Sequence, residues 1–147
     1  MKDILTNIVE NKREELKKRK ASLPMQAIRS RLTGDLPLIR SMSYALANST
    51  TGIIAEFKRK SPSKGWINEK AVPEKVTAAY DAAGATALSI LTDQEYFGGS
   101  LEYIGRVRSC GVDIPILRKD FIIDEYQVAE ARLAGADAVL LIAACLP

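Results

Sequence analysis

Three charged residues stand at the ends of two apolar segments that are typical of β-strands. Glu56 and Lys58 end the segment 53–58, and Lys119 ends the segment 115–119. A carboxylate beside two amines can hold an anionic substrate and move protons. The chain contains no histidine, which excludes Ser-His-Asp and Cys-His catalysis and the usual zinc and iron sites. Any proton transfer must therefore use Lys, Glu, Asp, Tyr or Cys.

The positions of these residues along the strands predict that they share one cavity. Side chains alternate between the two faces of a strand, so Glu56 and Lys58 share a face with Ile54. By the same rule Lys119 shares a face with Leu117. We expect this face to be the interior of a parallel sheet, with the charged groups at its carboxyl end. Two alternatives stay open: a buried Glu56–Lys58 salt bridge, and Lys119 as a solvated loop end.

The loops after these strands contain further candidates for binding. The segment 61–65, Ser-Pro-Ser-Lys-Gly, can form a polar lid or contact phosphate, and we favour the lid. Phe97 and Phe121 follow two of the strands, and they can be core aromatics or the walls of a pocket for an aromatic substrate. The sequence alone does not separate these two roles.

Strand and helix patterns alternate through the second part of the chain. A glycine follows each expected helix, which is the usual end signal. This alternation predicts an α/β fold with a parallel sheet and helical crossovers. The expected strands are 53–58, 87–91, 115–119 and 138–142, and the expected helices are 73–83, 101–110 and 125–134.

Two α/β architectures fit this order of elements. A dinucleotide-binding sheet needs G-x-G-x-x-G after its first strand, and the loop here reads KRKSPSKGW. We therefore predict a partial (β/α)8 barrel at 51–147, its first four strands, preceded by a helical extension at 1–50. A complete barrel needs roughly 200 to 250 residues. We expect a truncated chain whose open sheet edge could pair with a second copy.

The extension is expected to form helices at 3–20, 25–32 and 43–47. Ile4, Ile8 and Leu16 mark an apolar stripe on the first helix, with charged residues on its other faces. The formal net charge is only +3. We interpret the basic residues of this region as a solvated surface, because no aromatic residues lie between them to stack nucleic-acid bases.

The remaining composition indicates an ordinary globular domain. No apolar run approaches the roughly 18 residues that span a bilayer, and the N-terminus lacks the apolar region of a secretory signal. We expect a cytoplasmic protein with no membrane partner. Cys110 and Cys145 are not in a CxxC spacing, so we interpret them as free, small core residues.

Long motifs in this chain resemble those of one enzyme family. The segments IIAEFKRKSPSKGWI, LSILTDQEYFGGS, PILRKDFIIDEYQV and GADAVLLIAA resemble successive strands and loops of the indole-3-glycerol-phosphate synthases, which also carry a helical extension. The resemblance implies a lyase of tryptophan biosynthesis. Its substrate would be 1-(2-carboxyphenylamino)-1-deoxyribulose 5-phosphate, which closes to indole-3-glycerol phosphate with loss of CO2 and water. It implies no metal and no organic cofactor.

The resemblance also suggests roles for individual residues. Lys119 would be the general acid, Lys58 would hold the anthranilate carboxylate, and Glu56 would orient Lys58 or transfer a proton. The expected substrate-binding residues are Ser61, Phe97, Phe121 and Leu141. The family's further glutamate after the fifth strand, its asparagine after the sixth and its Glu-Ser-Gly loop after the seventh lie outside this chain. We therefore expect little activity from these 147 residues alone.

Three other readings remain as alternatives. A phosphoribosylanthranilate isomerase would need a Cys or Asp acid–base pair at the strand ends, which this trio does not provide. A non-catalytic half-barrel would associate through its open sheet edge. A nucleic-acid binder would show binding to random DNA that depends on salt.

Overall fold

The computed structural model of the chain describes residues 3–147. Three helices come before the first strand, and strands and helices then alternate to the C-terminus. The helices of the first part are α1 (Ile4–Ser22), α2 (Met25–Leu32) and α3 (Met42–Ala47). The second part consists of β1 (Ile54–Phe57), β2 (Lys60–Ser61), β3 (Gly65–Trp66), α4 (Pro73–Ala82), β4 (Ala87–Leu91), α5 (Glu102–Ser109), β5 (Ile116–Lys119), α6 (Glu125–Ala134), β6 (Ala138–Val139) and the 3₁₀ turn η1 (Ala143–Cys145).

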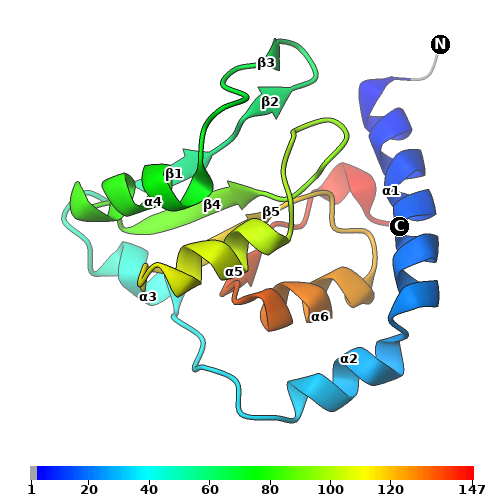
Figure 1. Cartoon of the computed structure of the whole chain (residues 1–147), viewed down its shortest axis with the longest axis horizontal. Coiled ribbons are helices and arrows are strands. Elements are labelled where there is room, and N and C mark those ends of the chain that lie inside the picture. Colours follow the sequence, from blue (N-terminus) through cyan, green and yellow to red (C-terminus); the bar gives the residue numbers. More distant parts are fainter. Residues whose placement is uncertain (1–2) are drawn as a thin grey trace.

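Four parallel strands form the main sheet in the order β1-β4-β5-β6. Helices α4, α5 and α6 cover one face of this sheet (Figure 1). Sequential parallel strands joined by helices on one face are the repeating unit of a (β/α)8 barrel. The predicted fold class, a partial barrel with a preceding helical extension, is therefore confirmed.

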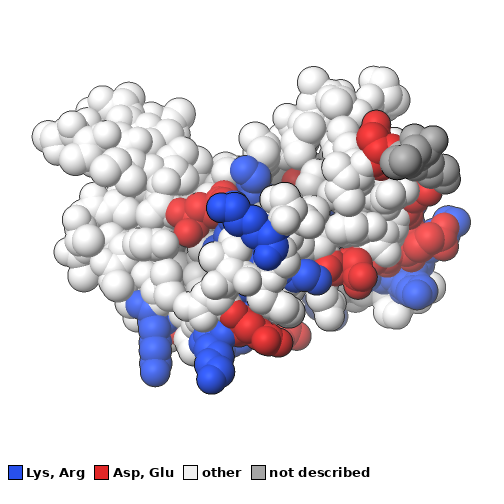
Figure 2. Space-filling model, turned by 90° about the horizontal axis from the view of Figure 1, so that it is seen from above, with Lys and Arg blue, Asp and Glu red and all other residues white. Residues whose placement is uncertain are grey.

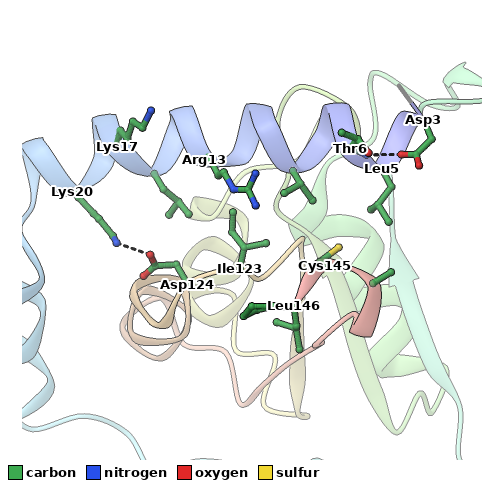
Figure 3. Close-up of a pocket in the computed structure, with 14 residues that line it drawn as sticks. Asp3, Leu5, Thr6, Arg13, Lys17, Lys20, Ile123, Asp124, Cys145 and Leu146 are labelled. Carbon is green, nitrogen blue, oxygen red and sulfur yellow. Dashed lines mark hydrogen bonds and ion pairs between the residues drawn. The ribbon is translucent and has the colours of Figure 1, made fainter. Parts of the chain in front are cut away.

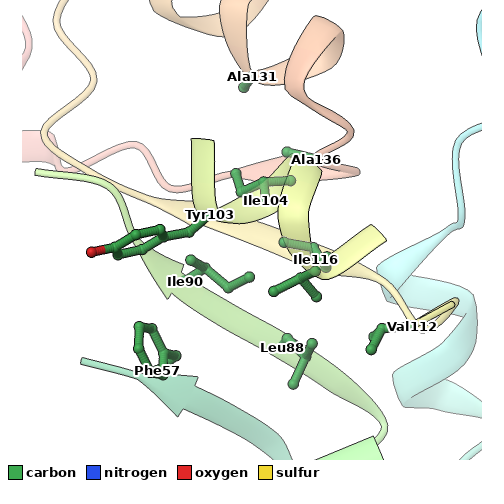
Figure 4. Packing of buried hydrophobic residues seen from close by; sticks show 10 residues of the cluster. Phe57, Leu88, Ile90, Tyr103, Ile104, Val112, Ile116, Ala131 and Ala136 are labelled. Carbon is green, nitrogen blue, oxygen red and sulfur yellow. The ribbon is translucent and has the colours of Figure 1, made fainter. Parts of the chain in front are cut away.

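The hydrophobic core lies between the sheet and these helices. Phe57, Leu88 and Ile116 project from three neighbouring strands toward Tyr103 and Ile104 of α5 (Figure 4). The Phe57 and Tyr103 rings meet edge to face with centroids 5.9 Å apart, which is a favourable geometry for aromatic pairs. The core takes one set of alternating side chains from each strand, so the other set faces the barrel interior.

The extension packs against the barrel units through a smaller apolar cluster. Leu16 of α1 and Ile28 of α2 are buried against Tyr126 of α6. The Tyr126 hydroxyl donates a hydrogen bond to the carbonyl of Leu23, at 2.7 Å. Helix α1 stands across the end of the sheet toward which the strand arrows point (Figure 1). It therefore borders the loops that follow β4 and β5.

Several basic residues of α1 and α2 have acidic partners. Lys20 forms an ion pair with Asp124 at 2.5 Å, and Arg19 pairs with Glu130 at 3.2 Å. On the face in Figure 2, positive and negative side chains lie beside one another. Among residues 3–147, no helix is both long enough and apolar enough to cross a membrane.

Several details differ from the sequence-based expectations. The loop after β1 contains the antiparallel hairpin β2–β3, where we expected irregular structure. The last strand ends at Val139 rather than at 142. Ile4 is 52% exposed, so the apolar stripe of α1 starts at Ile8. Cys110 is free as expected but exposed, because α5 ends just before it and turns it to the surface.

Candidate active site

Glu56, Lys58 and Lys119 come together on the interior face of the sheet. Lys58 Nζ lies 3.6 Å from Glu56 Oε1, and Lys119 Nζ lies 3.7 Å from Glu56 Oε2. One carboxylate thus stands between two ammonium groups, with one contact on each oxygen. The three side chains are 33–38% exposed, so the cluster is open to a ligand. It is neither a buried salt bridge nor a solvated loop end.

The register of the strands explains this convergence. Glu56 pairs with Ser89 across β1 and β4, and Leu91 pairs with Lys119 across β4 and β5. Residues in register on parallel strands point to the same side. Ser89 is buried and donates a hydrogen bond from its hydroxyl to Glu56 Oε2, at 2.9 Å. Ser89 was not predicted as a site residue, although it is the polar residue of an otherwise apolar strand.

Phe97 and Phe121 form an aromatic pair above this end of the sheet. Their ring centroids are 5.9 Å apart, with an angle of 39° between the planes, and both residues are half-buried. Phe97 precedes two glycines that let its loop turn back against β4. A Cβ on Gly99 would lie 2.2 Å from the carbonyl oxygen of Leu91, so no other residue fits there.

The structure does not bring Ser61 and Leu141 into this cluster. Ser61 is buried in the β2–β3 hairpin, where its hydroxyl accepts a hydrogen bond from the Lys64 amide at 3.2 Å. Leu141 is 58% exposed. Leu117 pairs with Ala138, so continued alternation puts Leu140, rather than Leu141, on the interior face.

A buried network of charges, which was not predicted from the sequence, lies beside the cluster. The ammonium of Lys12, on α1, contacts Asp93 Oδ1 at 2.7 Å and Asp120 Oδ1 at 3.1 Å. Arg118 extends the network, with contacts of 3.3 Å to both Asp120 and Glu130. Lys12, Asp93, Asp120 and Arg118 are at most 3% exposed. The signal in the sequence was the position of Lys12, midway between Ile8 and Leu16 on the apolar stripe.

The charges of this network stabilise one another. Burial alone would lower the pKa of Lys12, but Asp120 and Asp93 outweigh it and raise that pKa above the ordinary 10.5. Burial would likewise raise the pKa of Asp120, but Lys12 and Arg118 hold it below 3.8. Lys12 and Asp120 therefore both carry their charge at neutral pH.

A pocket of about 790 Å³ lies elsewhere, between α1 and the C-terminal turn. Leu5 of α1, Ile123 and Leu146 line it, together with Lys20 and Asp124 at one end (Figure 3). None of the seven predicted site residues lines this pocket. Within residues 3–147, no group of three or more His, Cys, Asp or Glu residues has the arrangement of a metal site.

Comparison with known proteins gives one consistent match. The family model described as indole-3-glycerol phosphate synthase matches residues 5–147. A protein of that name from Bacteroides thetaiotaomicron is 56% identical over 146 residues, covering 99% of this chain and 55% of its own length. A protein of the same name from Rhodopirellula baltica is 46% identical, and the match covers 97% of this chain and 55% of that protein. Another, from Neisseria meningitidis serogroup B, is also 46% identical, and the match covers 99% of this chain and 57% of that protein. The chain thus spans about half the length of the curated relatives it matches.

Proposed function

Because this chain belongs to the indole-3-glycerol phosphate synthase family, we propose that it contributes the catalytic carboxylate and amines of such an enzyme. The reaction converts 1-(2-carboxyphenylamino)-1-deoxyribulose 5-phosphate into indole-3-glycerol phosphate, CO2 and water. The observation that supports this proposal is the position of Glu56 between Lys58 and Lys119, at the carboxyl end of the strands. Barrel enzymes carry their active sites at this end.

The proposed roles follow from the charge of each group. Lys119 donates a proton to the substrate carbonyl while the ring carbon that carries the carboxylate forms the new carbon–carbon bond. CO2 then leaves and the ring becomes aromatic again. The former carbonyl oxygen departs as water after a further protonation, and the adjacent carbon loses a proton to a base as the double bond of the indole forms. Lys58 binds the anthranilate carboxylate until it is lost. Glu56 holds both amines in place and is the group that can return a proton to Lys119.

The proposed binding surface is aromatic. Phe97 and Phe121 form the wall against which the anthranilate ring packs, since flat apolar rings suit such a ligand. We retain Ser61 as a candidate for binding after a movement of the hairpin. We also retain Leu141, and from the strand register we add Leu140 on the interior face.

We further propose that residues 1–50 form the extension and 51–147 one half of the barrel. Four strands do not close a barrel, so we expect little turnover from this chain alone. Phosphate binding and the remaining catalytic groups would come from further strands. The cytoplasmic location stays a prediction.

The test is to complement this chain with the rest of a barrel. The segment of the Bacteroides thetaiotaomicron relative that this chain does not match would be co-expressed with it, giving what we call the complemented barrel. We expect indole-3-glycerol phosphate to form, and Lys119→Ala to reduce kcat on the order of 10²- to 10⁴-fold. Lys75→Ala, at an exposed position on α4, is the matched control. Equal turnover by the two variants, or no product from the unsubstituted complemented barrel, would contradict the proposal.

A second candidate is a non-catalytic half-barrel that associates with a second copy. The observation that favours it is the exposure of Ile53 and Ile54, 54% and 43%, at the outer strand β1. An unpaired apolar strand is a ready surface for strand pairing. Sedimentation of the chain alone would show a dimer that Ile54→Lys dissociates, whereas a monomer at all concentrations would exclude this candidate.

A further inference from the structure

The ammonium of Lys12 joins two loops that lie far from it in sequence. The Lys12 side chain enters from α1 and is almost completely enclosed, at 1% exposure. It contacts Asp93, the second residue after β4, and Asp120, the first residue after β5. Glu15, on the same helix, provides a third contact at 2.8 Å. The Lys12 ammonium therefore stands between two buried carboxylates and offsets their mutual repulsion.

Each of these carboxylates organises its own loop. Asp93 Oδ2 accepts a hydrogen bond from the amide of Tyr96 at 2.9 Å, and the Asp93 carbonyl accepts one from the amide of Gly99 at 2.8 Å. These bonds enclose the turn that carries Phe97. Asp120 Oδ1 accepts a hydrogen bond from the amide of Phe121 at 2.8 Å.

The two loops are also joined to each other below the aromatic pair. The Thr92 hydroxyl donates a hydrogen bond to Asp120 Oδ2 at 2.5 Å. Asp120 directly follows Lys119, whose ammonium contacts Glu56. A displacement of Asp120 would therefore move Phe121 and the end of the strand that carries Lys119.

We infer that Lys12 is a positioning residue, which sets the distance between Phe97 and Phe121 by clamping Asp93 and Asp120. This inference rests on the proposed function, since the aromatic pair is the proposed wall of the substrate site. Lys12 contacts none of the proposed catalytic groups. Its effect on the reaction is carried by the two carboxylates, and it concerns substrate binding more than the proton transfers.

The experiment compares Lys12→Met with Lys17→Met in the complemented barrel. Lys17 lies on the same helix and also pairs with a glutamate, Glu14, at 2.6 Å, but its side chain is 72% exposed. Kinetics would be measured under conditions where both variants are folded. We expect Lys12→Met to raise KM on the order of 10-fold or more, with a smaller change in kcat, because misplaced binding groups weaken substrate positioning. Lys17→Met should leave both constants unchanged.

Two further variants separate positioning from a general loss of structure. In Lys12→Met the two carboxylates lose the ammonium between them, although Asp120 keeps its contact with Arg118. Adding Asp93→Asn removes one of the two negative charges, so it should bring KM part of the way back to the original value, since asparagine also keeps an oxygen for the Tyr96 amide. Asp93→Asn alone is the milder variant if Lys12→Met does not fold. It replaces the ion pair with Lys12 by a weaker neutral contact, so the loop that carries Phe97 should shift while Phe121 stays in place. The contact between the two rings would be followed by NMR of labelled phenylalanine.

The outcomes distinguish the two proposals. A folded Lys12→Met variant that keeps the Phe97–Phe121 ring contact and the original KM would overturn the inference. A folded Asp93→Asn variant with an unchanged ring contact and an unchanged KM would also overturn the inference. If the ring contact is lost in Lys12→Met but the unsubstituted complemented barrel forms no indole-3-glycerol phosphate, the proposed function fails and the positioning role stands.

Discussion

Two charged clusters stand at the same end of the sheet, and they are built differently. The site cluster of Glu56, Lys58 and Lys119 is about one-third exposed, and its ion pairs are 3.6 and 3.7 Å long. The buried network around Lys12 is almost closed to solvent, with contacts of 2.7 and 3.1 Å from that ammonium to two carboxylates. The site cluster therefore holds its charges apart in a space open to solvent, whereas the buried network brings its charges into direct contact.

This difference separates groups that can serve a ligand from groups that serve the fold. Long ion pairs that are about one-third exposed leave donors and acceptors for a substrate, and they add little to stability in solvent. Buried charges must be paired, because an uncompensated buried charge is costly. Lysines and carboxylates therefore contribute differently to stability in the site cluster and in the buried network, and substitutions in each can measure the difference.

The largest expected effect is a difference in the free energy of unfolding when a lysine in each cluster is replaced by methionine. Lys12→Met should lower it by about 3–5 kcal/mol, because two buried carboxylates lose a partner. Lys119→Met should change it by less than about 1 kcal/mol. Urea unfolding of the two variants would measure both values. If both variants lost the same free energy of unfolding, the buried network would contribute no more to stability than the site cluster does.

Much of the fold follows from local patterns in the sequence. Helices α2 and α6 and strand β4 begin and end at the predicted residues, because proline, glycine and apolar periodicity mark their ends. The hairpin β2–β3 was not predicted, since its strands have two residues each and no alternating pattern. It depends on tertiary contacts such as those of Trp66, whose ring lies 5.2 Å from the Arg59 guanidinium and 5.4 Å from the Lys60 ammonium.

A second prediction concerns activity in the site cluster. Glu56→Gln removes the charge that holds both amines, so kcat of the complemented barrel should fall on the order of 100-fold. The free energy of unfolding should change by less than about 1 kcal/mol. Steady-state assays and urea unfolding would check the two parts. A loss of stability as large as that of Lys12→Met would place Glu56 with the buried network instead.

A third prediction uses pH to identify the buried network. The folded-state pKa of Asp120 lies below 3.8, so its stabilisation is present above that pH and is lost as pH falls through the folded value. The pKa of Lys12 is raised above 10.5, so its contribution persists up to that pH and is lost as pH rises further. Glu15, Asp93 and Asp120 face Lys12, and Arg118 faces Asp120.

The stability difference between the wild-type chain and Lys12→Met should therefore be largest near neutral pH. It should shrink by about 1–2 kcal/mol toward pH ~3, where protonation of Asp120 relieves the repulsion that the loss of Lys12 leaves in the variant. Urea unfolding across this range would measure it. A difference that is constant with pH would mean that Lys12 stabilises through packing and not through its charge.

The candidate site was predictable only where strand alternation could be counted. Glu56, Lys58 and Lys119 lie within strands or directly after them, so counting placed them on one face. Leu141 lies beyond the last paired residue, Val139, and the run of apolar residues at the end of the chain gives no polar residue to mark the faces. Its place in the site therefore stays a prediction. Lys12 could not be assigned from the sequence, since its two carboxylate partners follow it by more than 80 positions.

The smallest expected effect comes from Ser89, which links the sheet to the site cluster. Ser89→Ala removes the hydrogen bond to Glu56 Oε2, an interaction worth about 1 kcal/mol. Because Glu56 is one-third exposed, water can replace the lost donor, and we expect a decrease in kcat of about 5-fold. Ser109→Ala is the matched control, since that exposed hydroxyl bonds only to the Gly105 carbonyl of its own helix. If both alanine variants turn over at the same rate, Glu56 is held by its two lysines alone, and the site cluster depends even less on the surrounding fold than its geometry suggests.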